Sequence, residues 1–194
     1  MTIDEIGELL LRQGAAQYGQ EPVSQLDHAL QCAHLAEAAG ESAPTVAAAL
    51  LHDLGHLLKA DGLADRSQAH RDDLHQYIAL PFLRPTFGDE VLEPIRLHVD
   101  AKRYLCHADP VYFATLSPAS ARSLQMQGGI FDASQAAAFL RHSHAPTAVR
   151  LRRYDDRAKV PGTRTPSLGH YLEKLRKISV FHDQLGRRRK EPER

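Results

Sequence analysis

The hydrophobic residues of this chain recur at helical spacing, and the alternating β-branched runs that are typical of strands are absent. We therefore expect an all-α fold. The spacing predicts helices over residues 3–17, 24–39, 45–58, 72–84, 89–104, 118–127, 132–141, 145–153 and 168–184. The segment 45–58 is almost entirely apolar, which predicts a helix at the centre of a bundle.

The same pattern predicts a single domain over residues 1–184 followed by a charged, frayed tail over 185–194. Lysine plus arginine and aspartate plus glutamate number 24 each, so no net charge favours nucleic acid or an anionic membrane as a partner. No apolar run approaches membrane-spanning length, and the N-terminal residues lack the pattern of a signal peptide. These features predict a cytoplasmic protein.

The two cysteines, Cys32 and Cys106, are far apart in the sequence and form no CxxC pair. This spacing argues against a thiolate zinc site and against a disulfide-stapled secreted domain. We expect both cysteines to be small core residues in a reducing compartment.

The strongest local signal is the segment AALLHDLGHLL, in which His52 and Asp53 interrupt an apolar helix. A buried carboxylate without a partner is strongly unfavourable, and a metal ion is a natural partner for Asp53. A lone His–Asp pair is more often satisfied by neighbouring side chains. Gly55 allows a close approach of another element, and His56 lies one turn beyond His52.

The His–Asp pair is not isolated. His28 lies on the preceding predicted helix, and His98 and Lys102 are four residues apart on one helix face. His75 begins the apolar run HQYIALPFL, whereas its rival His70 lies in a polar stretch. Near the C-terminal end, Asp155 and its neighbour Asp156 are alternative ligands. We expect the other histidines to be surface or ordinary core residues (His34, His107, His142, His144, His170 and His182).

The order of these residues resembles that of the HD superfamily over roughly residues 18–160. It consists of a single histidine, a His–Asp pair, two separate histidines and a late aspartate. The resemblance implies a helical bundle with a buried dinuclear metal centre. It assigns one ion to His28, His52, Asp53 and Asp155, with Asp53 bridging to a second ion that His75 and His98 complete. Imidazole and carboxylate ligands without thiolate suit iron or manganese better than structural zinc.

Further segments narrow the resemblance. Four segments are together similar to the small HD-domain oxygenases of phosphonate catabolism: YGQEPVSQLDHALQCAHLAE, HVDAKRYL, LSPASARSLQMQGG and RRYDDRAK. That family uses a mixed-valent Fe(II)/Fe(III) di-iron centre and O₂ to cleave a carbon–phosphorus bond. The resemblance implies a 1-hydroxy-2-(amino or trimethylammonio)ethylphosphonate substrate, with phosphate and glycine or glycine betaine as products.

The resemblance also implies residue roles. Tyr18 would occupy an iron site until substrate arrives, Glu21 would meet the substrate nitrogen, and Tyr18 and Lys102 would take part in catalysis. A primary amine favours Glu21, whereas a trimethylammonium group favours the aromatic face of Tyr18, and both remain open. His56, Lys102, Ser120 and Arg152 would surround the phosphonate, which suits a dianion.

Taken singly, several of these residues have ordinary interpretations. Tyr18 and Glu21 are typical of a helix end and a first-turn carboxylate, and Ser120 of a helix start after Pro118. Arg152, beside other arginines, is typical of a solvated helix face. Only Lys102 stands out, because it shares a face with His98.

Two other functional classes fit parts of the pattern. An HD-type phosphohydrolase acting on a nucleotide or phosphate ester would share the ligands, with a metal-bound hydroxide attacking phosphorus. It would not account for Tyr18, Glu21 and the segment QMQGG together. A non-catalytic helical binding module would leave the buried His–Asp set without a purpose.

Overall fold

The computed structural model describes residues 1–63 and 74–180, and within these the chain is helical. The described residues contain no strand, only an isolated bridge between Gln17 and Ser24. This confirms the predicted all-α class. The helices are α1 (Ile3–Gln13), α2 (Gln25–Ala38), α3 (Ala43–Leu51), α4 (Leu54–Ala60), α5 (His75–Ile78), α6 (Leu80–Leu83), α7 (Asp89–Ala108), α8 (Pro110–Thr115), α9 (Pro118–Met126), α10 (Ala133–Leu140), α11 (Ala145–Arg157) and α12 (Leu168–Ile178).

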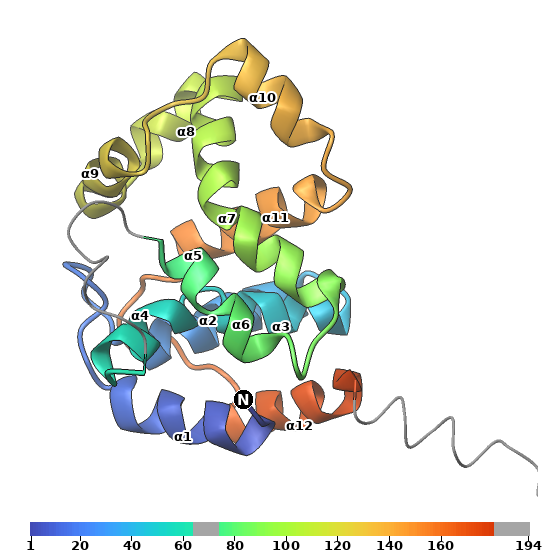
Figure 1. Cartoon of the computed structure of the whole chain (residues 1–194). Helices are drawn as coiled ribbons and strands as arrows, with labels where there is room; N and C mark the ends of the chain where they lie inside the picture. The colour runs from blue at the N-terminus through green and yellow to red at the C-terminus, as the bar shows by residue number, and fades with distance from the viewer. Residues whose placement is uncertain (64–73, 181–194) are drawn as a thin grey trace, which may run out of the picture.

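The helices are arranged around α3. In Figure 1, α1 and α12 lie side by side below the pair α2 and α3, and α7 rises beside α11 to the end formed by α8, α9 and α10. Residues 45–51 of α3 are all buried, as their apolar composition predicts. The predicted face of α1 also packs inward, with Ile6, Leu9 and Leu10 at most 1% exposed. The main core therefore surrounds α2 and α3, where the His–Asp pair lies.

The prediction of one helix over 45–58 is wrong. Helix α3 ends at Leu51 and α4 begins at Leu54, and Asp53 between them has φ −100° and ψ 10°. In a continuous helix, successive side chains point about 100° apart around the axis. The break instead lets His52 and Asp53 point into one cluster.

Other boundaries also shift. Helix α1 stops at Gln13 rather than residue 17, and α2 packs closely on the capping residue Gly14, where a Cβ would lie 2.8 Å from the Cβ of Leu26. The predicted helix 72–84 is divided into α5 and α6, and α12 ends at Ile178 rather than at residue 184. Helix α8 was not predicted. It is started by Asp109, whose side chain accepts hydrogen bonds from the Val111 and Tyr112 amides.

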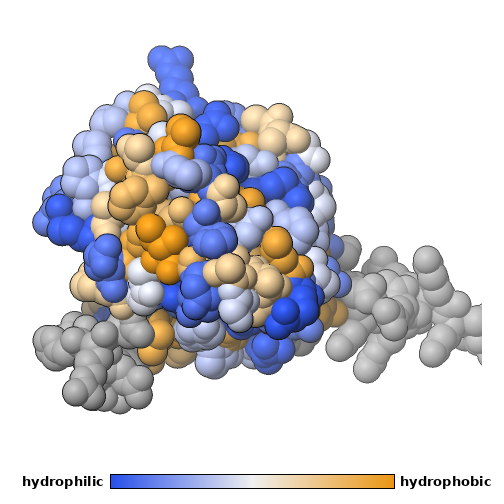
Figure 2. All heavy atoms as spheres, turned by 90° about the horizontal axis from the view of Figure 1, so that it is seen from above, coloured by the Kyte–Doolittle hydropathy of each residue, from blue (hydrophilic) through white to orange (hydrophobic). Residues whose placement is uncertain are grey.

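Figure 2 views the molecule from above in Figure 1 and shows hydrophobic side chains interspersed with hydrophilic ones on that face. Among the described residues, no helix combines the length and the apolarity needed to cross a membrane. His70, His182 and the predicted tail 185–194 lie outside the described residues. The single-domain boundary at residue 184 stays a prediction.

Candidate metal centre and anion pocket

Three buried imidazoles are held by backbone carbonyls. The Nδ1 atom of His28 lies 2.8 Å from the Ala158 carbonyl oxygen, that of His52 lies 2.9 Å from Ala49 O, and that of His98 lies 2.7 Å from Ile95 O. A carbonyl only accepts, so each Nδ1–H donates, and in the neutral ring each Nε2 keeps its lone pair. This is how metal-binding histidines are oriented in proteins.

One group of donor atoms is formed by α2, the α3–α4 junction and α11. The Nε2 atoms of His28 and His52 are 3.4 Å apart. Asp53 Oδ2 lies 3.6 Å from His28 Nε2 and 3.3 Å from His52 Nε2, and Asp155 Oδ1 lies 3.5 Å from His28 Nε2. Donor atoms about 2.1 Å from a shared ion would be separated by comparable distances.

A second group lies on the other side of Asp53. Its Oδ1 atom is 3.1 Å from His75 Nε2 and 3.7 Å from His98 Nε2, and these two nitrogens are 2.9 Å apart. His75 is at the start of α5, and α5 approaches α4 at Gly55. A Cβ at Gly55 would lie 2.1 Å from the His75 carbonyl oxygen, so only glycine fits there. The two oxygens of Asp53 thus face two different sets of donors.

The pKa shifts of Asp53 and His98 suit metal binding. Burial alone would raise the pKa of Asp53, but His52 and His75 outweigh it and hold this pKa well below its usual value. Burial, reinforced by His75 and His52, holds the pKa of His98 well below its usual value, which favours the neutral ring. Asp53 Oδ2 and Asp155 Oδ1 are buried and accept no hydrogen bond from the described residues. Buried anionic oxygens without donors fit cations.

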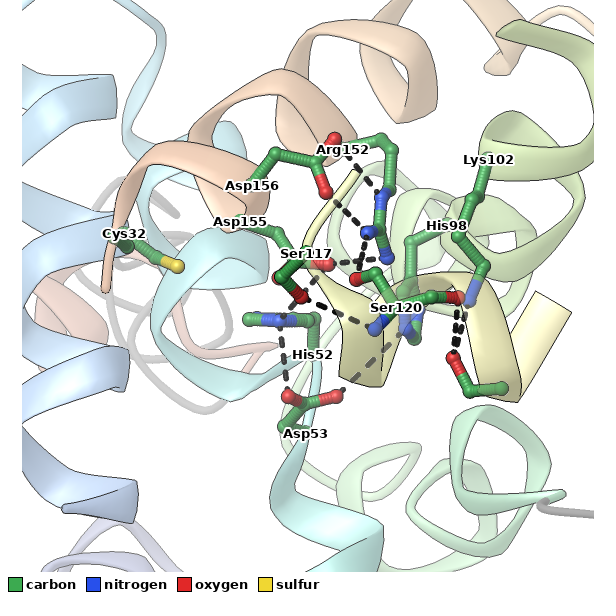
Figure 3. A network of polar contacts seen from close by, with 12 residues as sticks. Cys32, His52, Asp53, His98, Lys102, Ser117, Ser120, Arg152, Asp155 and Asp156 are labelled. Carbon is green, nitrogen blue, oxygen red and sulfur yellow. Dashed lines mark hydrogen bonds and ion pairs between the residues drawn. The ribbon is translucent and has the colours of Figure 1, made fainter. Parts of the chain in front are cut away.

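Asp156, the rival of Asp155, points away from this cluster (Figure 3). It accepts hydrogen bonds from Arg152 and from the Tyr112 hydroxyl. Arg152 also lies 2.6 Å from Asp155 Oδ2. Although burial alone would lower the pKa of Arg152, the two aspartates raise it well above its usual value. Asp155 therefore faces the imidazoles, and Asp156 holds the guanidinium in place.

A cavity of about 280 Å³ opens beside the second donor group. Its walls contain Asp53, Asp155, His75 and His98, the carboxylate of Glu21, and residues that can donate hydrogen bonds to an anion (Tyr18, His56, Lys102, Ser120, Ser123, Gln127, Arg152 and Lys159). Six predicted substrate-binding residues therefore lie in one cavity with the predicted ligands. The interpretation of Arg152 as part of a solvated helix face is wrong, because it is 4% exposed.

Lys102 is 2% exposed, and its Nζ atom donates to Ser123 Oγ at 2.8 Å. Burial, together with the nearby charge of Arg152, lowers the pKa of Lys102 from 10.5 to about 7. Arg152 donates to Ser120 Oγ at 3.1 Å. Lys102 and Arg152 are thus basic groups that are costly to bury, and each donates to a serine hydroxyl at one end of the cavity. This arrangement suits a phosphonate or phosphate group.

Tyr18 and Glu21 are carried by a tight loop between α1 and α2. The Tyr18 amide donates to Val23 O, and the Glu21 amide donates to Tyr18 O, both at 2.9 Å. The Tyr18 ring stacks on His28 with centroids 3.9 Å apart. Burial, and then the charges of Asp53 and Asp155, raise the pKa of Tyr18 well above its usual value. The Tyr18 side chain is thus a neutral phenol beside the first donor group. His56 stacks on His75 at 4.2 Å.

Sequence reasoning missed several neighbours of the site. Ser123 and Gln127 lie one and two turns after Ser120, a spacing that puts all three on one side of the α9 segment. Lys159 lies just past the end of α11. Cys32 is buried as expected, but its Sγ atom is 3.6 Å from His28 Nε2. Burial raises the pKa of this thiol well above its usual value, which favours the protonated form, a poor metal ligand.

Comparisons with known proteins show the family of this chain. The model of the HD domain matches residues 26–124. The chain is 43% identical to hydroxymethylphosphonate dioxygenase of Gimesia maris over 87% of this chain and 84% of that protein. It is 33% identical to [1-hydroxy-2-(trimethylamino)ethyl]phosphonate dioxygenase (glycine-betaine-forming) of Leisingera caerulea, over 93% and 91% of the two chains. An uncharacterised protein of Acanthamoeba polyphaga mimivirus is 31% identical over 88% of this chain and 78% of its own length.

The fold and the His–Asp cluster define an HD-domain protein with a site that could hold metal ions, and the chain belongs to the HD-domain family. Within that family it groups with the phosphonate oxygenases, and it is an enzyme of the dioxygenase class.

Proposed function

We propose that this enzyme uses O₂ and two iron ions to break the C–P bond of a 1-hydroxyphosphonate. The observation that carries the proposal is one cavity that joins two donor groups, bridged by Asp53, to a buried cationic end formed by Lys102 and Arg152. The two relatives are named for substrates that both contain the unit HO–C–P, which supports this substrate class.

In the proposed centre, His28, His52, Asp53 and Asp155 hold one ion, and Asp53, His75 and His98 hold the other. Nitrogen and oxygen donors without thiolate fit iron in mixed Fe(II)/Fe(III) states. When bound, the ions would supply O₂ activation and a chelating position for the substrate's hydroxyl and phosphonate oxygens. We also infer a cytoplasmic enzyme with a small-molecule substrate and no nucleic-acid or membrane partner.

The chain's own residues would bind and orient the substrate. Lys102 and Arg152 would neutralise the phosphonate, with Ser120 and His56 donating hydrogen bonds to its oxygens. This anchors phosphorus at one end and directs C1 towards the metal-facing side. The neutral phenol of Tyr18 would cover the first donor group, which keeps water from it until substrate enters, and would then withdraw.

The overall reaction balances without an external reductant. Hydroxymethylphosphonate and one O₂ would give formate, phosphate and a proton. The four electrons that reduce O₂ come from C1, as its bond to phosphorus and one of its bonds to hydrogen are replaced by bonds to oxygen. The predicted substrates with an amino or trimethylammonio group at C2 would react alike and give glycine or glycine betaine.

The test is to load the protein with Fe(II) without O₂, oxidise it partially, and add hydroxymethylphosphonate or 1-hydroxy-2-aminoethylphosphonate. We expect one phosphate released per O₂ consumed with at least one of them. Absence of O₂ uptake with both, while two ions stay bound, would contradict the proposal. Release of phosphate from phosphate esters without O₂ would then support the phosphohydrolase alternative.

A further inference from the structure

An ion pair within the protein lies in the wall of the cavity. The Nζ atom of Lys159 lies 3.2 Å from Glu21 Oε1, and each side chain is only 12% exposed. Both residues line the cavity that contains Asp53, His98 and Lys102. Sequence reasoning had singled out Glu21 as the partner of a substrate ammonium group, but it had given Lys159 no role.

The pair is held by three separate parts of the chain. Glu21 belongs to the loop before α2, Lys159 follows the end of α11, and Ser117 is the residue that caps α9. The Ser117 hydroxyl donates to Glu21 Oε1 at 2.6 Å, so this oxygen accepts from both Ser117 and Lys159. Glu21 is therefore already provided with an ammonium and a hydroxyl donor from the protein.

Lys159 also extends towards the anion-binding end. Its Nζ atom donates to Ser120 Oγ at 3.3 Å, and Ser120 Oγ accepts from Arg152 as well. Because both lone pairs of this oxygen have donors, its own proton is free to donate to a substrate oxygen. Lys159 thus links the carboxylate of Glu21 to the residues that would meet the phosphonate.

Lys159 also occupies the face of the Tyr18 ring. Tyr18 stacks on His28, and the Lys159 ammonium lies 5.9 Å from the centroid of the Tyr18 ring. That is the position a trimethylammonium group would take over an aromatic face. Lys159 therefore occupies both features that could recognise a cationic nitrogen, the carboxylate of Glu21 and the ring of Tyr18.

We propose that Lys159 is a specificity-determining residue that serves as an internal ammonium ion and selects 1-hydroxyphosphonates without a cationic nitrogen. A substrate ammonium would have to displace Lys159 from Glu21 and leave a second cation nearly buried beside Arg152. Displacing a partly buried, hydrogen-bonded ion pair is unfavourable. This inference rests on the proposed function for the identity of the phosphonate group, and it names the substrate class within it.

The experiment measures anaerobic binding of hydroxymethylphosphonate and 1-hydroxy-2-aminoethylphosphonate to the iron-loaded protein by calorimetry. We compare wild type with Lys159→Met and with Lys159→Arg, which retains the charge. Loss of Lys159 weakens phosphonate binding generally, so the readout is the ratio of the two dissociation constants, in which that common effect cancels.

Wild type and Lys159→Arg should prefer hydroxymethylphosphonate. Lys159→Met should shift the ratio at least about tenfold towards the amino substrate, since a charged hydrogen-bonded partner is worth that much. The shift should disappear in the double variant Glu21→Gln with Lys159→Met. Wild-type preference for the amino substrate, an unchanged ratio in Lys159→Met, or no binding of either compound would overturn the inference. The proposed function fails separately, by absence of O₂-dependent phosphate release.

Discussion

The site has a metal-facing half and an anion-facing half, and the two are built differently. In the metal-facing half, short side chains are fixed by the backbone, as the Nδ1 contacts of His28, His52 and His98 show. In the anion-facing half, long side chains are fixed by one another, as in the network of Arg152, Ser120 and Lys159. The metal-facing half is therefore rigid and suited to one kind of reaction. The anion-facing half can be adapted to different substrates by single substitutions.

The largest effect is expected for a ligand in the metal-facing half. His98→Ala should remove the second ion and reduce kcat by more than about 100-fold, since even the hydrogen-bond partners of ligands are worth 10- to 100-fold. Iron analysis and O₂ uptake measure this. His107→Ala, an exposed histidine on the same helix, is the matched control. If His98→Ala keeps full activity with one ion per chain, then the activity does not depend on a two-ion centre.

In the anion-facing half, Lys102→Met should lower kcat/KM about 10- to 100-fold, the value of a charge-assisted hydrogen bond, without loss of iron. Steady-state phosphate release and metal analysis check both parts. The half-exposed surface lysine Lys174, substituted to Met, is the control. If Lys102→Met loses iron in proportion to activity, then Lys102 supports the metal centre and the two halves are not separable.

The same substitution should stabilise the metal-free protein at low pH. The folded-state pKa of Lys102 is about 7 against 10.5 in the unfolded chain, so the buried charge destabilises the fold below pH 7. This penalty falls as pH rises from about 7 to 10.5, where the unfolded chain binds more protons. We expect Lys102→Met to raise the free energy of unfolding by about 1 to 3 kcal/mol at pH 6.

Urea denaturation of both proteins at pH 6 and at pH 9 measures that difference, and histidine titrations common to both cancel. The advantage of Lys102→Met should shrink at pH 9. A difference that is equal at the two pH values would mean that Lys102 is not neutral in the folded protein at high pH.

The smallest effect is expected for Tyr112→Phe. The Tyr112 hydroxyl donates to Asp156 and lies 3.2 Å from the Arg152 Nε atom, so its loss loosens the guanidinium without removing it. We expect KM to rise about 3- to 10-fold with kcat little changed, the net value of a typical hydrogen bond, because Asp155 and Asp156 still hold Arg152. Tyr104→Phe, which alters a tyrosine stacked on Phe139, is the control. A fall in kcat at constant KM would mean that Tyr112 acts on the metal-facing half.

The difference between the halves also explains what the sequence predicted. His52 and Asp53 are conspicuous because they are polar residues that interrupt an apolar segment, and this contrast is visible in a single sequence. Arg152 and Ser120 have no such contrast, since an arginine among arginines and a serine after a proline occur on most surfaces. Their placement came from resemblance alone, and the structure brings both into the cavity.

The fold was predictable in class but not at its breaks. Helical spacing located α2, α9 and α10 closely, because a capping side chain marks the start of each (Ser24, Ser117 and Asp132), whereas α11 continues four residues beyond its predicted end. It did not find the interruption at His52 and Asp53, because local spacing is compatible with an unbroken helix and the turn is stabilised by contacts distant in sequence. Lys159 was missed for the same reason, since its partners Glu21 and Ser120 come from other elements.

The most direct test of the two-ion centre is the iron content of Asp53→Ala, measured by metal analysis beside wild type and Asp156→Ala, with circular dichroism to verify folding. Because one carboxylate faces both donor groups, we predict about two ions per chain in wild type and Asp156→Ala, and loss of tight binding at both positions in Asp53→Ala. Two tightly bound ions in folded Asp53→Ala would contradict the bridging role.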